Sequence, residues 1–303
     1  PRHPIICRGI CWAFRFRWRM GHLKFPFIRS IYYIARACNN VVRGKRMTRE
    51  TKSVQRLFVD QPLAADKTLT LTGNPAHYLR NVLRAAADHA VLVFNGRDGE
   101  WRAHITAIDK RKVTLVTAHQ TRPQTTPETR QADIWLLVAP VKRARLDYLA
   151  QKATEMGVTR LVPVITRRTQ GGTVNLERLR ANAQEAAEQC GILKVPEITA
   201  PARLEDTLQD WDGARRLLFC DETAETGMGV SELAECIRTP LAVLIGPEGG
   251  FTPEEKDELL ALGQTVQISL GPRILRTDTA VVAALALVQW LVGDWQDGPA
   301  DVG

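Results

Sequence analysis

The chain has 303 residues, of which 45% are hydrophobic and 24% are charged, and its formal net charge is +8. This balance is typical of a folded globular protein with room for two domains, and it argues against a disordered or membrane protein. No apolar run approaches the ~20 residues of a membrane-spanning helix, so no membrane partner is expected.

The positive charge is concentrated at the start of the chain. Residues 1–46 contain eleven Lys and Arg residues and no Asp or Glu, so residues 47–303 hold 30 basic and 33 acidic residues. We expect 1–46 to be a basic leader, disordered or non-native, upstream of a true start at Met47. The alternative is an arm that binds RNA, because arginine and aromatic residues alternate at 14–19.

General cofactor and metal motifs are missing from the sequence. The six cysteines form no Cys-x-x-Cys pair and no Cys/His cluster with zinc-ligand spacing, so we expect no metal. Scattered cysteines suit a reducing cytoplasm, which is the predicted location. The sequence also has no Gly-x-Gly-x-x-Gly turn after a strand and no P-loop, so neither a dinucleotide fold nor a P-loop fold is supported.

Residues 47–121 carry the pattern of a small β-barrel. Short strands are expected at 56–59, 68–71, 91–94, 100–108 and 112–118, with one helix over 76–86. Residues 122–131 contain two prolines and no apolar residue, which predicts a linker.

Residues 132–295 alternate strands with helices, which predicts an α/β domain around a largely parallel, buried sheet. Strands are expected at 134–138, 161–165, 217–219, 242–245 and 266–270, and helices at 144–156, 176–189, 231–237, 253–262 and 279–291. Residues 296–303 are expected to be a tail.

Two loops follow strands late in this domain. The first is Gly-Pro-Glu-Gly-Gly at 246–250, whose glycines allow a positive φ and close backbone approach. Thr252 is expected to cap the helix that follows it. By itself, this sequence also fits an ordinary strand-to-helix turn.

The second loop holds Arg273 and Arg276 between a buried strand and a buried helix, for which Thr277 and Asp278 are natural caps. Two cations at the carboxyl edge of a sheet are costly unless they are paired or functional. Ligands of open α/β sheets bind at this edge, so the two loops together predict a ligand pocket.

The sequences of the two loops resemble those of the RsmE methyltransferases, a family of the SPOUT superfamily. The resemblance rests on Ile-Gly-Pro-Glu-Gly-Gly-Phe at 245–251 and on Ser-Leu-Gly-Pro-Arg-Ile-Leu-Arg-Thr-Asp-Thr-Ala at 269–280. It extends to 152–158, 185–191 and 77–84, so it covers nearly everything from Arg56 to Trp290.

The resemblance implies an α/β protein with a small N-terminal PUA-like β-barrel, followed by a SPOUT α/β domain with a C-terminal trefoil knot. General topology rules alone argue against a knot. The resemblance also implies a homodimer that binds S-adenosyl-L-methionine. The implied reaction is methylation of N3 of a specific uridine in small-subunit (16S) ribosomal RNA.

Site residues are carried over from the family by position. The cofactor-binding residues are expected to be Ile245, Gly246, Pro247, Glu248, Gly249, Gly250, Leu270, Gly271, Ile274, Leu275, Arg276 and Thr279. RNA contacts are expected from His77, Arg80, Arg84, Arg97, Lys142, Arg145 and Lys152. The barrel cations also fit ordinary solvated surface charge.

The implied chemistry is a direct displacement that depends on alignment of donor and acceptor. Loss of the N3 proton builds negative charge on the flanking carbonyl oxygens, and Arg276 is expected to stabilise that charge. Glu248, water and the RNA itself are the alternatives for the proton acceptor.

Two positions depart from the family pattern, and two other functions stay open. Ile192 stands where an Arg is expected, and residues 85–89 replace an Arg- and Gly-containing turn. One alternative function is methylation of a ribose 2′-hydroxyl by a SPOUT enzyme, although those enzymes have an Asn-rich final loop. The other is a non-catalytic RNA-binding assembly factor.

Overall fold

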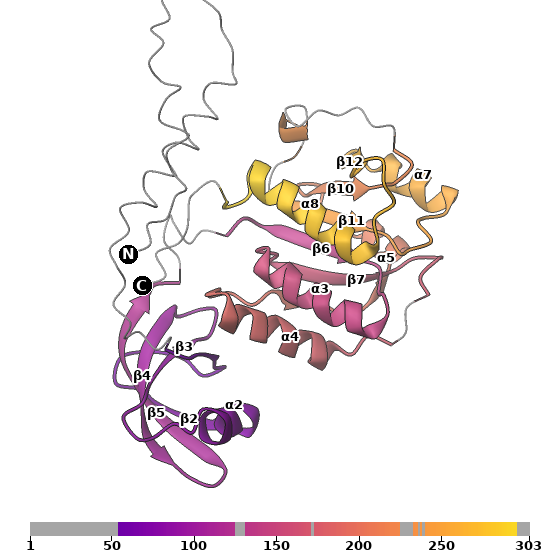
Figure 1. Cartoon of the computed structure of the whole chain (residues 1–303). Coiled ribbons are helices and arrows are strands. Elements are labelled where there is room, and N and C mark those ends of the chain that lie inside the picture. The colour runs from indigo at the N-terminus through magenta and orange to yellow at the C-terminus, as the bar shows by residue number, and fades with distance from the viewer. Residues whose placement is uncertain are drawn as a thin grey trace, which may run out of the picture. The chain divides into compact units, whose positions relative to one another are not determined.

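A computed structural model describes residues 54–124, 131–170, 173–224, 233–235, 237 and 240–295. Two sheets follow each other along the chain, in the order that the sequence predicts (Figure 1). The expectations for residues 1–46 and 296–303 lie outside the described residues, as does 125–130 of the expected linker. Of the helix expected at 231–237, the structure describes 233–235, which are helical, and 237.

The first sheet is the expected small β-domain. Its strands are β1 (Arg56–Phe58), β2 (Thr68–Thr72), β3 (Ala90–Phe94), β4 (Glu100–Ile108) and β5 (Lys112–Arg122). They are ordered β1-β3-β4-β5-β2, and every pair is antiparallel except β1 with β3. Alternating apolar residues such as Leu69, Ile105 and Leu115 are fully buried, so one face of the sheet forms the core.

Two predicted boundaries in this domain are wrong. The helix expected over 76–86 is a short helix α2 (Gly73–His77) followed by a π-helical turn η1 (Tyr78–Val82). Arg84 has a φ of 50°, which a helix cannot continue through, so the helical propensity of the alanines at 85–87 is overridden. Strand β5 extends to Arg122, beyond its expected end at 118.

The second sheet is parallel throughout. Its strands are β6 (Ile134–Val138), β7 (Arg160–Ile165), β8 (Glu197–Ile198), β10 (Arg216–Cys220), β11 (Leu241–Ile245) and β12 (Thr265–Ile268), in the order β12-β10-β11-β6-β7-β8, and β9 (Ala202–Arg203) pairs with β7. The expected strands are confirmed with small shifts at their ends, whereas the short strands β8 and β9 were not predicted.

Helices cover both faces of this sheet. They are α3 (Arg143–Glu155), α4 (Leu176–Gln189), α5 (Leu204–Gln209), α7 (Pro253–Ala261) and α8 (Thr277–Val292). Apolar residues of α3, α4 and α8 share one core with β6 and β11, while α5 and α7 pack on the other face around Phe219 (Figure 1). Buried strands between two helix layers explain the continuous apolar runs in the sequence.

None of the helices in the described residues combines the length and the apolar character needed to cross a membrane. The same residues contain no group of three or more His, Cys, Asp or Glu side chains that could hold a metal ion.

Candidate active site at the carboxyl edge of the parallel sheet

A cavity of about 190 Å³ lies where strands β10, β11 and β12 end. These three strands are parallel neighbours, so the loops that follow them meet at one edge of the sheet. The cavity is lined by Cys220, Asp221, Glu222, Ile245, Gly246, Pro247, Glu248, Gly249, Ser269, Leu270, Gly271, Arg273, Ile274, Leu275, Thr277 and Ala280.

The loop at 246–250 is shaped by close packing behind it. A Cβ atom on Gly246 would lie 2.5 Å from Cε2 of Phe251, whose buried ring packs edge-on against Phe219 at 5.1 Å. Gly250 has a φ of 65°, and its N–H donates to the carbonyl of Pro247 at 2.9 Å. Small residues are therefore required where the backbone turns back on itself.

The expected cap of α7 at Thr252 is confirmed and fixes the exit from this loop. The Thr252 hydroxyl accepts from the N–H of Glu255 at 3.3 Å, and the Glu255 carboxylate accepts from the N–H of Thr252 at 2.9 Å. Glu255 is buried, and its other oxygen accepts from the N–H of Arg167 at 2.7 Å. The reciprocal pair of Thr252 and Glu255 fixes the start of α7. The bond from Arg167 then ties Glu255 to the segment after β7.

The loop at 269–276 is tied to the first by Thr277. Its hydroxyl donates to the carbonyl of Gly246 at 3.1 Å. Neither Thr277 nor Asp278 caps α8 as predicted, because Arg276 is the N-cap residue and makes no side-chain cap bond. The Ile274 side chain is 89% exposed at the cavity wall, which is unusual for a large apolar residue.

Most of the residues expected to bind the cofactor come together in the cavity. Nine of the twelve line it, and Gly250, Arg276 and Thr279 do not. The Arg276 side chain is 66% exposed, and its Nε lies 3.9 Å from the Asp278 carboxylate. The structure therefore leaves the guanidinium of Arg276 outside the cavity wall.

The residues after β10 were missed by the sequence analysis. Asp221 is buried, and its carboxylate accepts from Lys256 Nζ and Gln267 Nε2, both at 2.9 Å, and from Thr223. Burial acts to raise the pKa of Asp221, but these hydrogen bonds outweigh it and hold the pKa below its ordinary value. An acidic pair directly after a buried strand was the available signal.

Two arginines from other elements contact the loop at 246–250. Arg145 of α3 forms an ion pair with Glu248, and Arg168 donates to the carbonyl of Gly249 at 2.9 Å. Lys142 is exposed at the start of α3. Lys152 lies further along α3, where its hydrogen bond to Glu155 raises the pKa of Lys152 above its ordinary value.

The predicted RNA-binding residues of the barrel fall into two groups. His77 and Arg80 line a cavity of about 500 Å³ whose wall also includes three basic residues, Lys110, Arg111 and Lys112, next to the β4–β5 turn. Arg84 and Arg97 are exposed and do not line this cavity. The basic residues after β4 were not predicted as RNA contacts.

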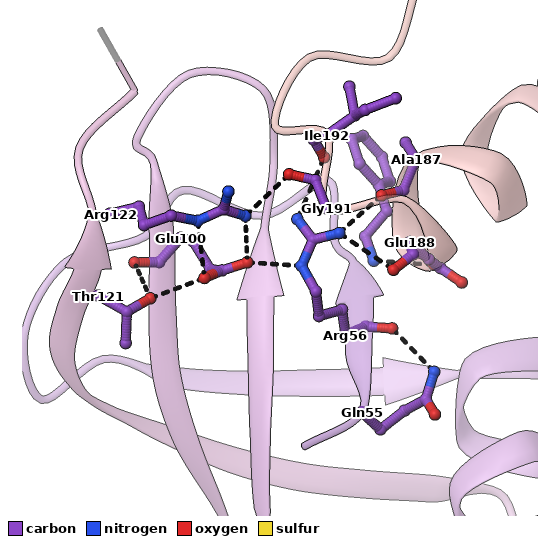
Figure 2. A network of polar contacts seen from close by, with 10 residues as sticks. Gln55, Arg56, Glu100, Thr121, Arg122, Ala187, Glu188, Gly191 and Ile192 are labelled. Carbon is purple, nitrogen blue, oxygen red and sulfur yellow. Dashed lines mark hydrogen bonds and ion pairs between the residues drawn. The ribbon is translucent and has the colours of Figure 1, made fainter. Parts of the chain in front are cut away.

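A buried ion cluster joins the barrel to the end of α4, as Figure 2 shows. The Glu100 carboxylate accepts from Arg56 Nε at 2.6 Å and from Arg122 Nη2 at 2.8 Å. Arg56 Nη1 also donates to the carbonyl of Ala187 at 2.6 Å, and Arg122 Nη2 donates to that of Gly191 at 2.9 Å. The two guanidinium groups thus satisfy carbonyls at the C-terminus of a helix, where cations are favoured.

The same region explains one departure from the family pattern. The Ile192 side chain packs against an apolar cluster of Phe94, Ala187 and Leu193, and its carbonyl accepts from Arg56 Nη2 at 3.1 Å. At this position the chain places a half-buried apolar group in place of a charge.

The comparisons with known proteins agree with this architecture. A family model described as the RNA methyltransferase domain matches residues 127–289, and one described as the RNA methyltransferase PUA domain matches residues 71–117. The chain is 32% identical to ribosomal RNA small subunit methyltransferase E of Rickettsia conorii, over 78% of this chain and 95% of that protein. It is 26% identical to the protein of the same name from Bacillus subtilis, over 78% of this chain and 96% of that protein.

A solved structure shows the same fold. The ribosomal RNA small subunit methyltransferase E of Neisseria gonorrhoeae, bound to S-adenosyl methionine, has a TM-score of 0.67 and is 26% identical, over 80% of this chain and 99% of that one. The expected α/β class is confirmed, with a PUA-like domain followed by a SPOUT-type methyltransferase domain. The trefoil knot stays a prediction. These matches extend over both domains, and the chain belongs to the RsmE family of RNA methyltransferases.

Proposed function

We propose that this protein transfers a methyl group from S-adenosyl-L-methionine to N3 of a specific uridine in small-subunit (16S) ribosomal RNA. The observation that carries the proposal is the cavity at the ends of β10, β11 and β12, which gathers nine of the residues expected to bind the cofactor. The relatives named ribosomal RNA small subunit methyltransferase E support the choice of substrate.

The cavity suits S-adenosyl-L-methionine in shape and chemistry. Ile245, Leu270 and Leu275 supply apolar walls for an adenine ring, and the glycines let backbone groups approach it. A ligand against Ile274 would cover an apolar side chain that is otherwise 89% exposed. The Glu222 carboxylate at the wall is an acceptor of the kind that binds ribose hydroxyls.

The bound cofactor supplies an activated methyl group, so the protein residues mainly orient the acceptor and manage one proton. The uracil N3 has to lose its proton as negative charge builds on the flanking carbonyl oxygens. Arg276 follows the cavity loop directly, and we assign it to stabilise that charge. The Glu248 carboxylate is engaged in an ion pair with Arg145, so water or the RNA is the better placed proton acceptor while that ion pair holds.

The reaction is tested with small ribosomal subunits from cells that lack the modification. The purified protein and S-adenosyl-L-methionine are added, and the digested RNA is analysed by mass spectrometry. A gain of 3-methyluridine is expected. A gain of 2′-O-methyluridine would reject the proposed acceptor atom, and bound RNA without any gain would favour an assembly factor.

In the same assay, Arg276→Ala is expected to lower the rate of methyl transfer by at least about 100-fold, because it removes a transition-state contact. RNA binding should be mostly retained. Arg216→Ala is the matched control, since Arg216 is at the opposite end of β10 from the cavity. An Arg276→Ala enzyme with the wild-type rate would remove this residue from the mechanism.

The remaining expectations are also proposals. We infer a homodimer, supported by large apolar side chains exposed on two adjacent helices, namely Tyr148 on α3 at 42% and Trp290 on α8 at 60%. A monomer in sedimentation velocity would contradict it.

We also propose the trefoil knot, for which an experimental chain trace is the test.

The domain boundaries and the location are proposed on the same basis. We assign residues 47–121 to an RNA-binding barrel and 132–295 to the methyltransferase domain, with 122–131 between them. RNA- and cofactor-binding assays on full-length variants, each substituted in one of the two regions, test this division. The proposed substrate puts the protein with the ribosomal subunits in the cytoplasm, which cell fractionation tests.

A further inference from the structure

A second cavity, of about 260 Å³, adjoins the first along Pro247, Glu248 and Gly249. Its other walls are Pro140, Val141, Lys142, Arg168 and Gln170, which come from the segment before α3 and from the segment after β7. The two cavities share this stretch of loop, in which Gly249 has no side chain. A ligand in the second cavity would lie beside a ligand in the first.

The second cavity is basic. Among the described residues that line it, the only carboxylate is that of Glu248, which is already paired with Arg145. Within the described part of the chain, no carboxylate lies within 4 Å of the charged groups of Lys142 and Arg168, and Arg168 donates to a neutral carbonyl. The cations therefore leave the cavity with a net positive charge, which favours an anion.

The start of α3 adds to this charge. Its N-cap is Lys142, and its first turn holds Arg143 and Arg145. That first turn contains no acidic residue. Cations near a helix N-terminus are unfavourable for the helix. Their presence beside a basic cavity fits a site that binds phosphate.

We propose that this second cavity receives the target nucleotide, unstacked from the RNA, and that Lys142 and Arg168 bind its phosphate. This inference rests on the proposed function. In an in-line transfer the acceptor atom must come within about 3.5 Å of the methyl group, so its pocket has to adjoin the cofactor cavity. Enzymes that modify a base take it out of the stack, and Pro140, Val141 and Pro247 offer apolar surfaces to a pyrimidine face.

The test compares Arg168→Gln with Arg167→Gln. Arg167 is the neighbouring residue, but its side chain faces Glu205, Glu254 and Glu258 at 3.4–3.9 Å and does not line this cavity. Binding of unmodified small subunits is measured with S-adenosylhomocysteine at several salt concentrations. Arg168→Gln should weaken binding about tenfold and reduce the salt slope by about 0.7, whereas Arg167→Gln should change neither.

Two further measurements distinguish the proposal from a structural role. Affinity for S-adenosyl-L-methionine should be unchanged in Arg168→Gln, and the single-turnover rate at saturating subunits should fall at least about tenfold. Equal loss in both variants would overturn the proposal. So would a parallel loss of cofactor affinity, which would mean that Arg168 only supports the carbonyl of Gly249.

Failure of the proposed function would be visible separately. The binding comparison needs no turnover, so wild-type protein that binds subunits but makes no 3-methyluridine rejects the reaction while the cavity is still tested. Wild-type protein that does not bind the subunits would reject both.

Discussion

Gly246→Ala is expected to lower the affinity for S-adenosyl-L-methionine by at least about 100-fold. The added methyl group would lie 2.5 Å from Phe251 Cε2, far inside van der Waals contact. Phe251 is 3% exposed and packs against Phe219, so its ring has no free space into which to move. The loop has to shift instead. The carbonyl of Gly246, which accepts a hydrogen bond from the Thr277 hydroxyl, shifts with it.

The affinity is measured by isothermal titration calorimetry, with thermal unfolding alongside. Overpacking of this kind costs about 1–3 kcal/mol of stability, so the variant should stay folded at room temperature. Gly263→Ala is the matched control, because nothing lies within 4 Å of a Cβ atom at that position. If Gly246→Ala bound the cofactor as tightly as the wild type does, the loop at 246–250 would not form the cofactor site.

Glu100→Gln is expected to lower the free energy of unfolding by about 3 kcal/mol, because it removes the carboxylate that pairs with two largely buried arginines. The Glu100 side chain is 5% exposed, and those of Arg56 and Arg122 are 11% and 16% exposed. Glutamine keeps the shape but removes the counter-charge that is hydrogen-bonded to both guanidinium groups. Chemical denaturation at pH 7 measures the effect.

The effect of Glu100→Gln should depend on pH. Burial acts to raise the pKa of Glu100, but the hydrogen bonds and charges of Arg122 and Arg56 outweigh it and hold the pKa below its ordinary value. The stability that Glu100 supplies is therefore complete above its unfolded pKa of about 4.3 and is lost as the pH falls through the folded value. The difference between wild type and variant should shrink below about pH 4.

A nearby carboxylate has the opposite pH dependence and needs to be separated from this effect. Burial raises the pKa of Glu188, so its contribution is complete below its unfolded pKa and is lost as the pH rises towards the folded value. Glu188 is present in both proteins, and the opposite sign of its pH dependence distinguishes it from Glu100. Asp109→Asn is the surface control, because the Asp109–Lys112 pair is more than half exposed and should contribute under about 0.5 kcal/mol. If Glu100→Gln lowered the free energy of unfolding by no more than Asp109→Asn does, the buried cluster would not stabilise the fold as proposed.

The sequence predicts the long elements of this fold well and the short ones poorly. Apolar runs and helical periodicity locate β6, β11, α4 and α8 to within two residues, since burial on both faces leaves a strong pattern. Strands β8 and β9 have only two residues each, and the helix α5 has six, too few for any periodicity to register. At Arg84, a left-handed backbone ended a helix that the alanines favoured.

For the site, the glycine loop and the loop at 269–276 carry distinctive sequences, so nine residues of the cavity wall were expected from them. Asp221 and Glu222 were not, because only the sheet order, with β10 between β11 and β12, brings the end of β10 to the same edge. Arg168 was missed for the same reason, since its contact with Gly249 spans 81 positions of the chain. Contacts between loops that are distant in sequence leave no local pattern.

The ion cluster at the end of α4 has a consequence for how the chain acquires its structure. Arg56 and Arg122 are synthesised well before the carbonyls of Ala187, Gly191 and Ile192 that they bind. During synthesis on the ribosome, about seventy residues beyond Arg122 must therefore be added before the guanidinium groups of Arg56 and Arg122 can form all their hydrogen bonds. Completion of the barrel and docking of α4 are then one cooperative event, and heat should unfold the two domains in a single transition.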